Sequence, residues 1–131
     1  MAEKKSFRAL NTRSKSNEGI KVPLKDTDDK PTEDWLRVRG IDSDVFQHEN
    51  RRMRANVLGY LEKNGLAAKD TPEYVDFTLS EQRKLQACLV SEWSFEEPCT
   101  PENVNALFLD APYIAAQVDE AASKRSQFVG V

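Results

Sequence analysis

The spacing of apolar residues predicts one long helix near the middle of the chain. Between Asp44 and Asn64, apolar residues recur at intervals of three, four and seven, as they do on one face of a helix. This apolar stripe consists of Phe46, Met53, Val57, Tyr60 and Leu61. Asp42 or Ser43 can cap the start, and Gly65 suits the left-handed conformation that often ends a helix. We therefore predict a helix over residues 44–64.

Three shorter helix patterns follow, and each has its own start signal. Thr78 precedes Glu81 by three residues, a capping-box spacing that predicts a helix over about residues 79–92. Thr100 followed by Pro101 predicts the next start, because threonine caps helices and proline is tolerated at the first helical position. Pro112 ends that helix and begins the last one. The inner face of the last helix should hold Ile114, Ala115, Val118, Ala121 and Ala122.

Two short apolar runs before the long helix predict a β-ribbon. Residues 20–24 and 35–39 flank a polar segment, KDTDDKPTED, that is typical of a turn. Pro23 cannot donate a ladder hydrogen bond, so the first strand should lie at an edge. We thus predict a mainly α-helical domain with about four helices and a short N-terminal two-stranded β-ribbon.

The composition divides the chain into three parts. Residues 1–19 are basic and polar, which predicts a flexible N-terminal arm, either simply solvated or ordered by a partner. Residues 20–125 should form a single globular domain, since 131 residues suffice for one modest core. Residues 126–131 should form a C-terminal tail in which Phe128 is a solitary large apolar group.

Charge and hydropathy exclude several classes of protein. The formal net charge of −3 provides no overall attraction to nucleic acid or to an anionic membrane. No apolar run approaches the roughly 18–20 residues that cross a bilayer. The N-terminal residues lack the apolar core of a secretory signal. We therefore expect a cytoplasmic protein that has no membrane partner and for which nucleic acid is a less favoured partner than protein.

The residues that usually perform chemistry are sparse. A single histidine, His48, excludes a histidine cluster for a metal, and the acidic turn lacks the glycine and final glutamate of a calcium loop. No phosphate-binding loop, dinucleotide fingerprint or nucleophile elbow is present. Cys88 and Cys99 lack a CxxC spacing and should be reduced thiols, with a disulfide between them as the lesser alternative. We expect no catalytic residue, metal ligand or cofactor, and hence a protein that is not an enzyme.

Two groups of residues are candidates for partner binding. Arg51, Arg52 and Arg54 form a basic cluster on the long helix, open to three interpretations: a solvated face, phosphate contacts, or pairing with an acidic surface such as another copy of this chain. The second group belongs to the alanine-rich last helix and the tail, and it either docks on a partner or packs inside the domain. Its members are Ala115, Val118, Ala122 and Phe128.

Three sequence blocks resemble a known family. The block WSFEEPCTPENVNALFLDAPYIAAQVDEAASKRSQF, from Trp93 to Phe128, resembles the end of tail assembly chaperones from long-tailed bacteriophages. IKVPLKD from Ile20 and WLRVRGIDSDVF from Trp35 resemble the start of the same proteins, in the same order. The resemblance covers most of the chain beyond residue 19, and its motifs are diagnostic in combination.

The resemblance implies a non-catalytic role in assembling the phage tail. Such proteins bind the tape measure protein, keep it soluble, and help to recruit subunits of the tail tube protein. They act in the cytoplasm of the bacterial host and are absent from the mature virion, and a ribosomal frameshift extends many of them. A homo-oligomer would fit such a role, because many weak copies along one long client favour avidity. The alternatives are a small helical DNA-binding regulator and, third, a structural tail protein retained in the virion.

Overall fold

Three short strands form the sheet on which the helices are arranged. The computed structural model describes residues 3–130, and in that part of the chain the sheet is antiparallel with strand order β1–β2–β3. The strands are β1 (Ile20–Lys25), β2 (Pro31–Val38) and β3 (Val90–Trp93). The expected ribbon is present as β1 and β2, and Pro23 lies in an edge strand as predicted.

The prediction of a helix over residues 79–92 is wrong at its C-terminal end, because residues 90–93 form the strand β3. Val90 pairs with Val38, and Trp93 pairs with Leu36 across an irregularity in the register. Because of this irregularity, Val90 and Trp93, which are three positions apart, lie opposite Val38 and Leu36, which are two positions apart and buried. Strand β2 would otherwise present an unpaired edge, so pairing with β3 satisfies backbone groups that a longer helix would leave open.

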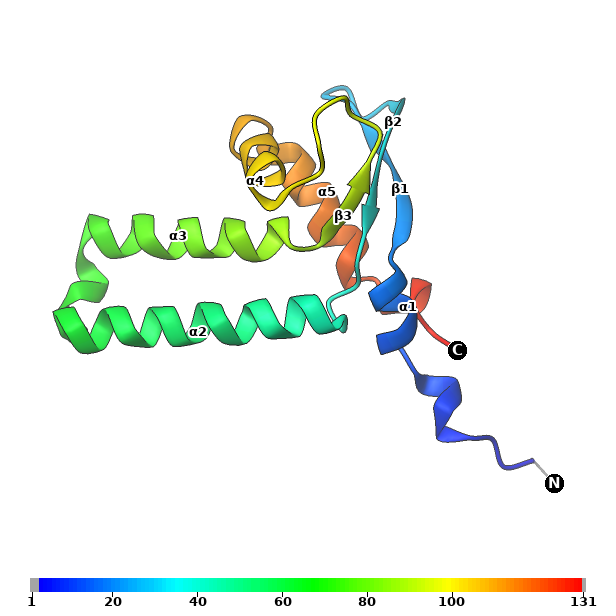
Figure 1. Ribbon diagram of the computed structural model, residues 1–131, viewed down its shortest axis with the longest axis horizontal. Helices are drawn as coiled ribbons and strands as arrows, with labels where there is room; N and C mark the ends of the chain where they lie inside the picture. The colour runs from blue at the N-terminus through cyan, green and yellow to red at the C-terminus, as the bar shows by residue number, and fades with distance from the viewer. Residues whose placement is uncertain (1–2, 131) are drawn as a thin grey trace.

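Helices make up most of the described chain (Figure 1). The five α-helices of residues 3–130 are α1 (Arg13–Glu18), α2 (Asp44–Asn64), α3 (Pro72–Ala87), α4 (Pro101–Asp110) and α5 (Pro112–Ser123). The short 3-10 turns are η1 (Phe7–Leu10), η2 (Leu66–Asp70) and η3 (Arg125–Gln127). The fold is thus mainly helical with a small sheet, with one strand and one short helix more than predicted.

The capping residues of α2 and α4 behave as the sequence predicts. Ser43 Oγ accepts a hydrogen bond from the Phe46 backbone N–H at 3.3 Å, and Thr100 Oγ1 accepts one from Asn103 at 3.2 Å. Gly65 follows α2 with a φ of +83°, a conformation that glycine adopts without strain. These local signals place both helices without help from tertiary packing.

Helix α3 begins earlier than predicted because a different threonine caps it. Thr71 Oγ1 accepts a hydrogen bond from the Tyr74 backbone N–H at 3.2 Å, and Pro72 occupies the first helical position. Thr78, the predicted cap, lies inside the helix and donates to the Val75 carbonyl at 3.0 Å. The Thr-Pro pair is therefore the true start signal, as it is at the beginning of α4.

The core lies between the inner face of the sheet and the helices α4 and α5. Strand residues Leu36 and Val38 are fully buried there against Val104 and Phe108 of α4 and the inner face of α5. The side chain of Gln117 covers the end of the free edge of β1: its amide accepts from the Lys25 N–H and donates to the Lys25 carbonyl, both at 2.9 Å. This capping of an exposed edge protects it from pairing with another strand.

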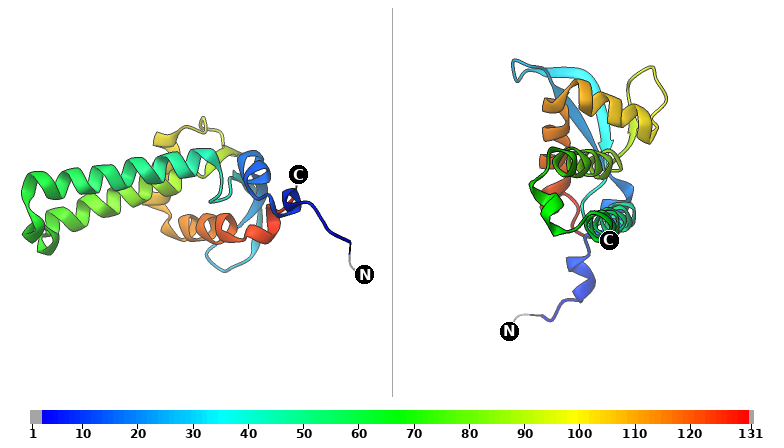
Figure 2. Two further views of the ribbon diagram at one scale, coloured as in Figure 1. Left: turned by 90° about the horizontal axis from the view of Figure 1, so that it is seen from below. Right: turned by 90° about the vertical axis from the view of Figure 1, so that its left-hand side faces the viewer.

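Helices α2 and α3 form an antiparallel hairpin, here called the arm, that projects from this body (Figures 1 and 2). None of the residues of α2 is fully buried, because only α3 packs along most of its apolar stripe. Tyr60 stacks on Phe77 with ring centroids 4.7 Å apart. The buried Glu81 accepts hydrogen bonds from Asn56 at 3.3 Å and Lys84 at 3.4 Å. The arm is therefore two helices thick over its outer half.

Helix α1 and the C-terminal segment through Gly130 pack against the base of the arm, whereas the sequence predicted a flexible arm over residues 1–19 and a tail over residues 126–131. Ser16 of α1 is buried, and its carbonyl accepts from the Gly40 N–H at 3.2 Å. Phe128 has 0% of its surface exposed, and the Gly130 N–H donates to the Asn11 carbonyl at 2.7 Å. A large aromatic ring gains too much by burial to remain in a solvated tail. Residues 3–10, by contrast, extend away from the body (Figure 1).

We predict that Phe128→Ala destabilises the protein by about 3–5 kcal/mol, because it leaves a cavity where a fully buried ring was packed. Urea unfolding followed by circular dichroism measures the change. Phe7→Ala is the matched control, since Phe7 is 76% exposed and should alter the midpoint little. Equal stability of the two variants would contradict the observed packing of the C-terminus.

Two glycine substitutions should have opposite effects on stability. A Cβ at Gly59, within α2, meets nothing within 4 Å, so Gly59→Ala should stabilise the protein by roughly 0.5–1 kcal/mol through helix propensity. A Cβ at Gly40 would overlap Ser16 Oγ and lie 2.8 Å from Ser16 Cβ, so Gly40→Ala should destabilise it by about 1–3 kcal/mol. Thermal unfolding of both variants tests the pair, and a shift in the same direction would be inconsistent with this packing.

Candidate functional site

The predicted residues of the last helix and tail lie in the core. Val118, Ala122 and Phe128 are almost completely buried, and Ala115 is 8% exposed. Helix α5 packs on β1, β2 and α4, and its alanines allow that close approach. The interpretation of these four residues as partner contacts is therefore corrected: they stabilise the domain and are not accessible to a partner in the folded chain.

The predicted arginines lie on α2. All three are exposed to solvent, and Arg52 also forms a salt bridge with Glu49, with Nη2 and Oε2 2.8 Å apart. His48 is also exposed on this helix. The arm thus offers three accessible guanidinium groups near its middle, one of them paired with Glu49, which remain candidates for contacts with an acidic surface.

One cavity lies where the arm joins the body. It has a volume of about 560 Å³, and both cysteines line it together with Arg39 and Arg52. Arg39 Nη1 donates a hydrogen bond to the Cys88 carbonyl at 2.7 Å, so this arginine stabilises the fold at the cavity wall. Among residues 3–130, no group of three or more histidine, cysteine or acidic side chains is arranged to hold a metal ion.

Burial makes the two thiols poor nucleophiles. Desolvation raises the pKa of the Cys88 thiol to about 12, and it also raises the pKa of Cys99. Cys88 Sγ donates a hydrogen bond to the Leu85 carbonyl at 2.9 Å, and this bond favours the protonated thiol. Both cysteines are free in the structure. At neutral pH these thiols are protonated, and their place is that of small packed side chains.

Large apolar side chains are exposed on the arm and on the helices beside it. On the arm they are Val45, Leu58, Leu66, Val75 and Leu79, and on α4 and α5 they are Leu109 and Tyr113. A groove of about 410 Å³ separates α3 from α4 and α5, and Leu79, Leu109 and Ala116 line it. Leu79 and Leu109 therefore expose apolar surface in one groove, and apolar surface gathered at one place marks interaction sites more often than scattered apolar residues do.

Sequence reasoning did not identify this groove. Leu79 was placed at the first position of a helix whose true start lies seven residues earlier, at Pro72. Its outward face, Val75 and Leu79 followed by Gln82 and Gln86, has a helical spacing that a correct start would have made visible. Leu109 lies outside the buried stripe of α4, and only the packing of α3 against α4 shows what it adjoins.

Asp119 of α5 gives the groove an unusual electrostatic character. Its Oδ2 accepts a hydrogen bond from Gln86 Nε2 at 2.5 Å. Burial raises the pKa of the Asp119 carboxyl, against the opposing effect of that hydrogen bond. None of the ion pairs in the described part of the chain includes Asp119. The carboxylate is thus partly desolvated and compensated by a neutral amide.

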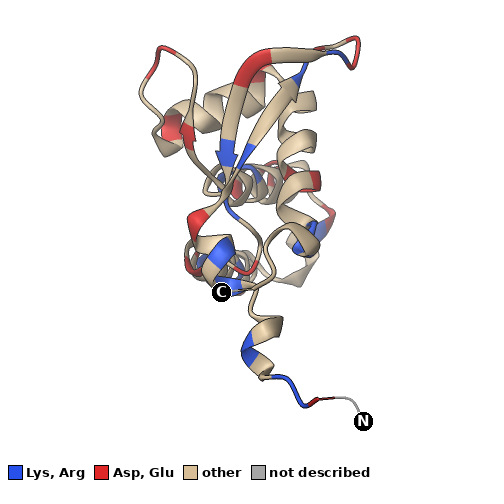
Figure 3. Cartoon of the chain, turned by 90° about the vertical axis from the view of Figure 1, so that its right-hand side faces the viewer, with Lys and Arg blue, Asp and Glu red and all other residues tan. Residues whose placement is uncertain are grey.

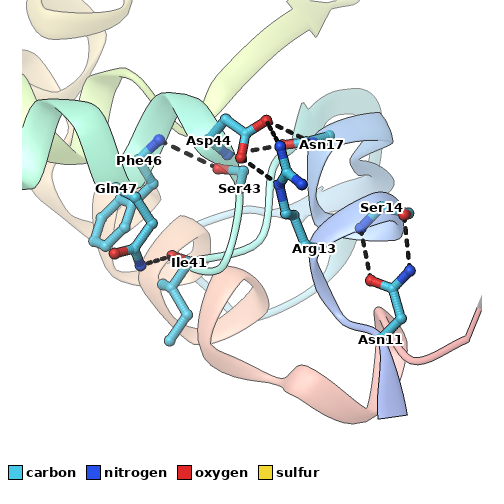
Figure 4. Close-up of polar contacts among 9 residues, drawn as sticks. All are labelled: Asn11, Arg13, Ser14, Asn17, Ile41, Ser43, Asp44, Phe46 and Gln47. Atoms are coloured by element: carbon cyan, nitrogen blue, oxygen red, sulfur yellow. Dashed lines mark hydrogen bonds and ion pairs between the residues drawn. The ribbon is translucent and has the colours of Figure 1, made fainter. Parts of the chain in front are cut away.

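A polar network attaches both chain ends to the start of α2. Arg13 and Asn17 of α1 reach Asp44 (Figure 4), with Arg13 Nε 2.6 Å from Asp44 Oδ1. Arg125 Nε lies 2.8 Å from Asp42 Oδ2, to which Thr12 Oγ1 also donates at 2.6 Å. Hydrogen bonds from Arg125 and Thr12 hold the pKa of the Asp42 carboxyl below its ordinary value. The base from which the arm projects is therefore fixed by charge-assisted hydrogen bonds.

Comparison with protein-family models, with curated proteins and with solved structures finds no match for this chain. Among the described residues, no helix combines the length and the apolar character needed to cross a membrane.

The Asp42 network predicts how stability changes with pH. Because folding lowers the pKa of Asp42, its contribution is present above the unfolded value of about 3.8 and is lost as pH falls through the lower folded value. Asp42→Asn should cost ~0.5–1 kcal/mol at pH 7, since the pair is partly exposed, and the difference from wild type should become smaller at pH 3, below the unfolded pKa of about 3.8. Urea unfolding at pH 7 and pH 3 measures both. Asp28→Asn, in the exposed β1–β2 turn, is the control; a pH-independent difference for Asp42→Asn would refute the assignment.

Proposed function

We propose that this protein is a non-catalytic chaperone of phage tail assembly that binds the tape measure protein, keeps it soluble and helps to recruit tail tube subunits. The resemblance of the sequence blocks around Ile20, Trp35 and Trp93 to such chaperones supports the proposal. The structural observation that carries it is the exposure of large apolar side chains on the arm and along the groove beside it. A protein with these features can cover apolar helical surface on a client.

Helix packing explains how the arm would serve that purpose. Two antiparallel helices leave half of each apolar circumference uncovered, and a third helix laid against them completes the packing. The arm is anchored at its base by the buried Phe128 and by the Asp42 and Asp44 networks. A client helix would therefore meet a surface that is already ordered, which reduces the entropy lost on binding.

The remaining parts of the proposal follow from the family resemblance. The chaperone would act in the cytoplasm of the infected bacterium and be absent from the mature virion. Several copies would bind one long client, and association between copies would raise their avidity. A frameshifted, longer form of this chain is a further expectation.

Exposed arginines favour one competing function, that of a small helical DNA-binding regulator. Arg51 and Arg54 could contact phosphates from α2. The net charge of −3 opposes this function, as does the mixture of acidic and basic residues on the sheet side of the molecule (Figure 3). A DNA-binding regulator would bind DNA with an affinity that falls steeply as the salt concentration rises. A structural protein of the tail, the third alternative, would instead be detected in purified virions.

Co-expression tests the proposed function. We expect the tape measure protein encoded by the same phage to shift from the insoluble to the soluble fraction when this chain is co-expressed, and the two to co-purify. Shielding of apolar surface on the client is the physical reason. A small helical protein of unrelated sequence, co-expressed at the same level, is the control. An insoluble client with no co-purification would rule out this chaperone function.

A further inference from the structure

Acidic and basic residues are segregated along this chain. Every charged residue in the range 85–123 is acidic, whereas three of the four charged residues in the range 3–10 are basic. Opposite charges at two places on one chain favour contacts between copies. We propose that residues 3–10 of one copy, here called the N-terminal segment, dock in an acidic pocket beside α4 of a second copy. The inference specifies the association between copies that the proposed function includes, and it rests on that function for its role in the cell.

The acidic pocket lies between α4 and residues 93–97, and its volume is about 400 Å³. Its lining includes two aromatic rings, two apolar side chains and two carboxylates, which belong to Trp93, Phe95, Ala106, Leu107, Glu97 and Asp110. The rings meet edge to face with their centroids 5.3 Å apart, and Trp93 Nε1 donates a hydrogen bond to the Glu97 carbonyl at 2.6 Å. The aromatic wall is therefore ordered before a ligand binds, which reduces the entropy lost on binding.

The charge of this pocket is one-sided. Among residues 3–130, no lysine, arginine or histidine belongs to its lining. Glu97 and Asp110 are exposed, and neither takes part in the ion pairs of the described chain. A basic side chain that enters the pocket would meet two carboxylates and two aromatic rings, and both kinds of group attract cations. The pocket therefore favours a basic side chain that has apolar neighbours.

The N-terminal segment presents apolar side chains that its own chain leaves uncovered. Phe7 is 76% exposed and Leu10 is 69% exposed. They are the first and last residues of η1, and side chains three residues apart eclipse one another in a 3-10 turn. Ser6 Oγ caps this turn by accepting a hydrogen bond from the Arg8 backbone N–H at 3.2 Å. Phe7 and Leu10 thus form one small apolar face that can contact the apolar wall of the pocket.

Cations adjoin this apolar face. Lys4, Lys5 and Arg8 are exposed, and none of them belongs to an ion pair in the part of the chain that the structure describes. The Arg8 guanidinium carbon lies 5.0 Å from the centroid of the Phe7 ring, so a positive charge and an aromatic ring would enter the pocket together. The segment and the pocket are therefore complementary in charge as well as in apolar surface.

The direction of the N-terminal segment indicates that the pocket it fills belongs to another copy. Figures 1 and 2 show the segment extending from α1 away from α4. Because the segment and the pocket are different surfaces, the contact is head to tail, and each copy can donate one segment and receive another. Such contacts can continue from copy to copy, as expected for many copies bound along one long client.

A basic segment of the client is the competing occupant of the pocket. The second copy is favoured because this chain itself supplies both the exposed cations and the exposed apolar face that the pocket requires. Docking of the segment on its own chain is the other alternative. It would leave the protein monomeric, so a measurement of mass distinguishes it from the head-to-tail contact.

Sedimentation velocity of the full-length chain tests the contact. Wild type should associate as its concentration rises and dissociate in high salt, because exposed ion pairs are screened. Two variants remove the charges: the segment variant (Lys4→Gln, Lys5→Gln and Arg8→Gln) and the pocket variant (Glu97→Gln and Asp110→Asn). Each should associate about tenfold more weakly than wild type, since the ion pairs between copies are lost.

A mixture of the two variants guards against a loss of association caused by poor folding. The pocket variant keeps its segment and the segment variant keeps its pocket, so the mixture should form a complex of one copy of each. The control, Asp28→Asn with Glu33→Gln, neutralises two exposed carboxylates outside the pocket and should associate like wild type. A monomeric wild type, a segment variant that associates like wild type, or a mixture that stays monomeric would each overturn the inference.

NMR locates the contact within the mixture. Unlabelled pocket variant added to labelled segment variant should shift the amide signals of Trp93 and Leu107, which line the intact pocket. The signal of Leu66, in the turn that joins α2 to α3, should stay at its free position. Shifts confined to α2 and α3 would reject the pocket as the site of contact.

Co-expression with the tape measure protein separates this inference from the proposed function. Head-to-tail association without solubilisation of the client would retain the contact between copies and reject the chaperone function. Solubilisation by a wild type that never self-associates would retain the function and overturn the inference. Loss of solubilisation in the pocket variant alone, with the segment variant still active, would assign the pocket to the client and likewise overturn it.

Discussion

Burial of the C-terminal Phe128 against Gly40 and α1 is the interaction on which the rest of the structure depends. It brings the C-terminal segment and α1 together beneath the start of α2, where the Ser16 carbonyl also accepts a hydrogen bond from the Gly40 N–H. Gly40 lacks a side chain because a Cβ would occupy the space taken by Ser16. With the chain fixed at that point, α2 can extend outward although none of its own residues is fully buried. Charge-assisted hydrogen bonds at Asp42 and Asp44 reinforce the same junction.

The packing of the core decides which apolar residues of the helices remain exposed at the candidate site. The small sheet needs a covering layer, and α5 supplies it with an alanine-rich face that can approach the strands closely. That demand removes Ala115, Val118 and Ala122 from the surface. The leucines left over, on the outward faces of α3 and α4, then line a groove with a carboxylate inside it. A surface of this kind suits non-covalent recognition, and the half-buried, protonated cysteine thiols suit packing.

The fold could be predicted from the sequence wherever a helix carries its own end signals. Ser43, Thr100 and Gly65 act through hydrogen bonds and backbone conformation within a few residues of the helix they end, so α2 and α4 were placed correctly. Helix α3 was misplaced because two threonines offered competing starts, and Thr71 with Pro72 prevailed over Thr78. Strand β3 was missed because Val90–Trp93 becomes a strand only beside β2, more than fifty residues away in the sequence.

Local chemistry thus determined the helix starts, the edge position of Pro23, the scarcity of residues suited to catalysis and the basic cluster on α2. Tertiary structure alone decided which apolar residues are hidden and which are exposed. An apolar stripe has the same spacing whether it faces the core, as in α5, or a groove open to solvent, as on the outer side of α3. The difference depends on which helix packs against which face, and that is a property of contacts between residues distant in sequence.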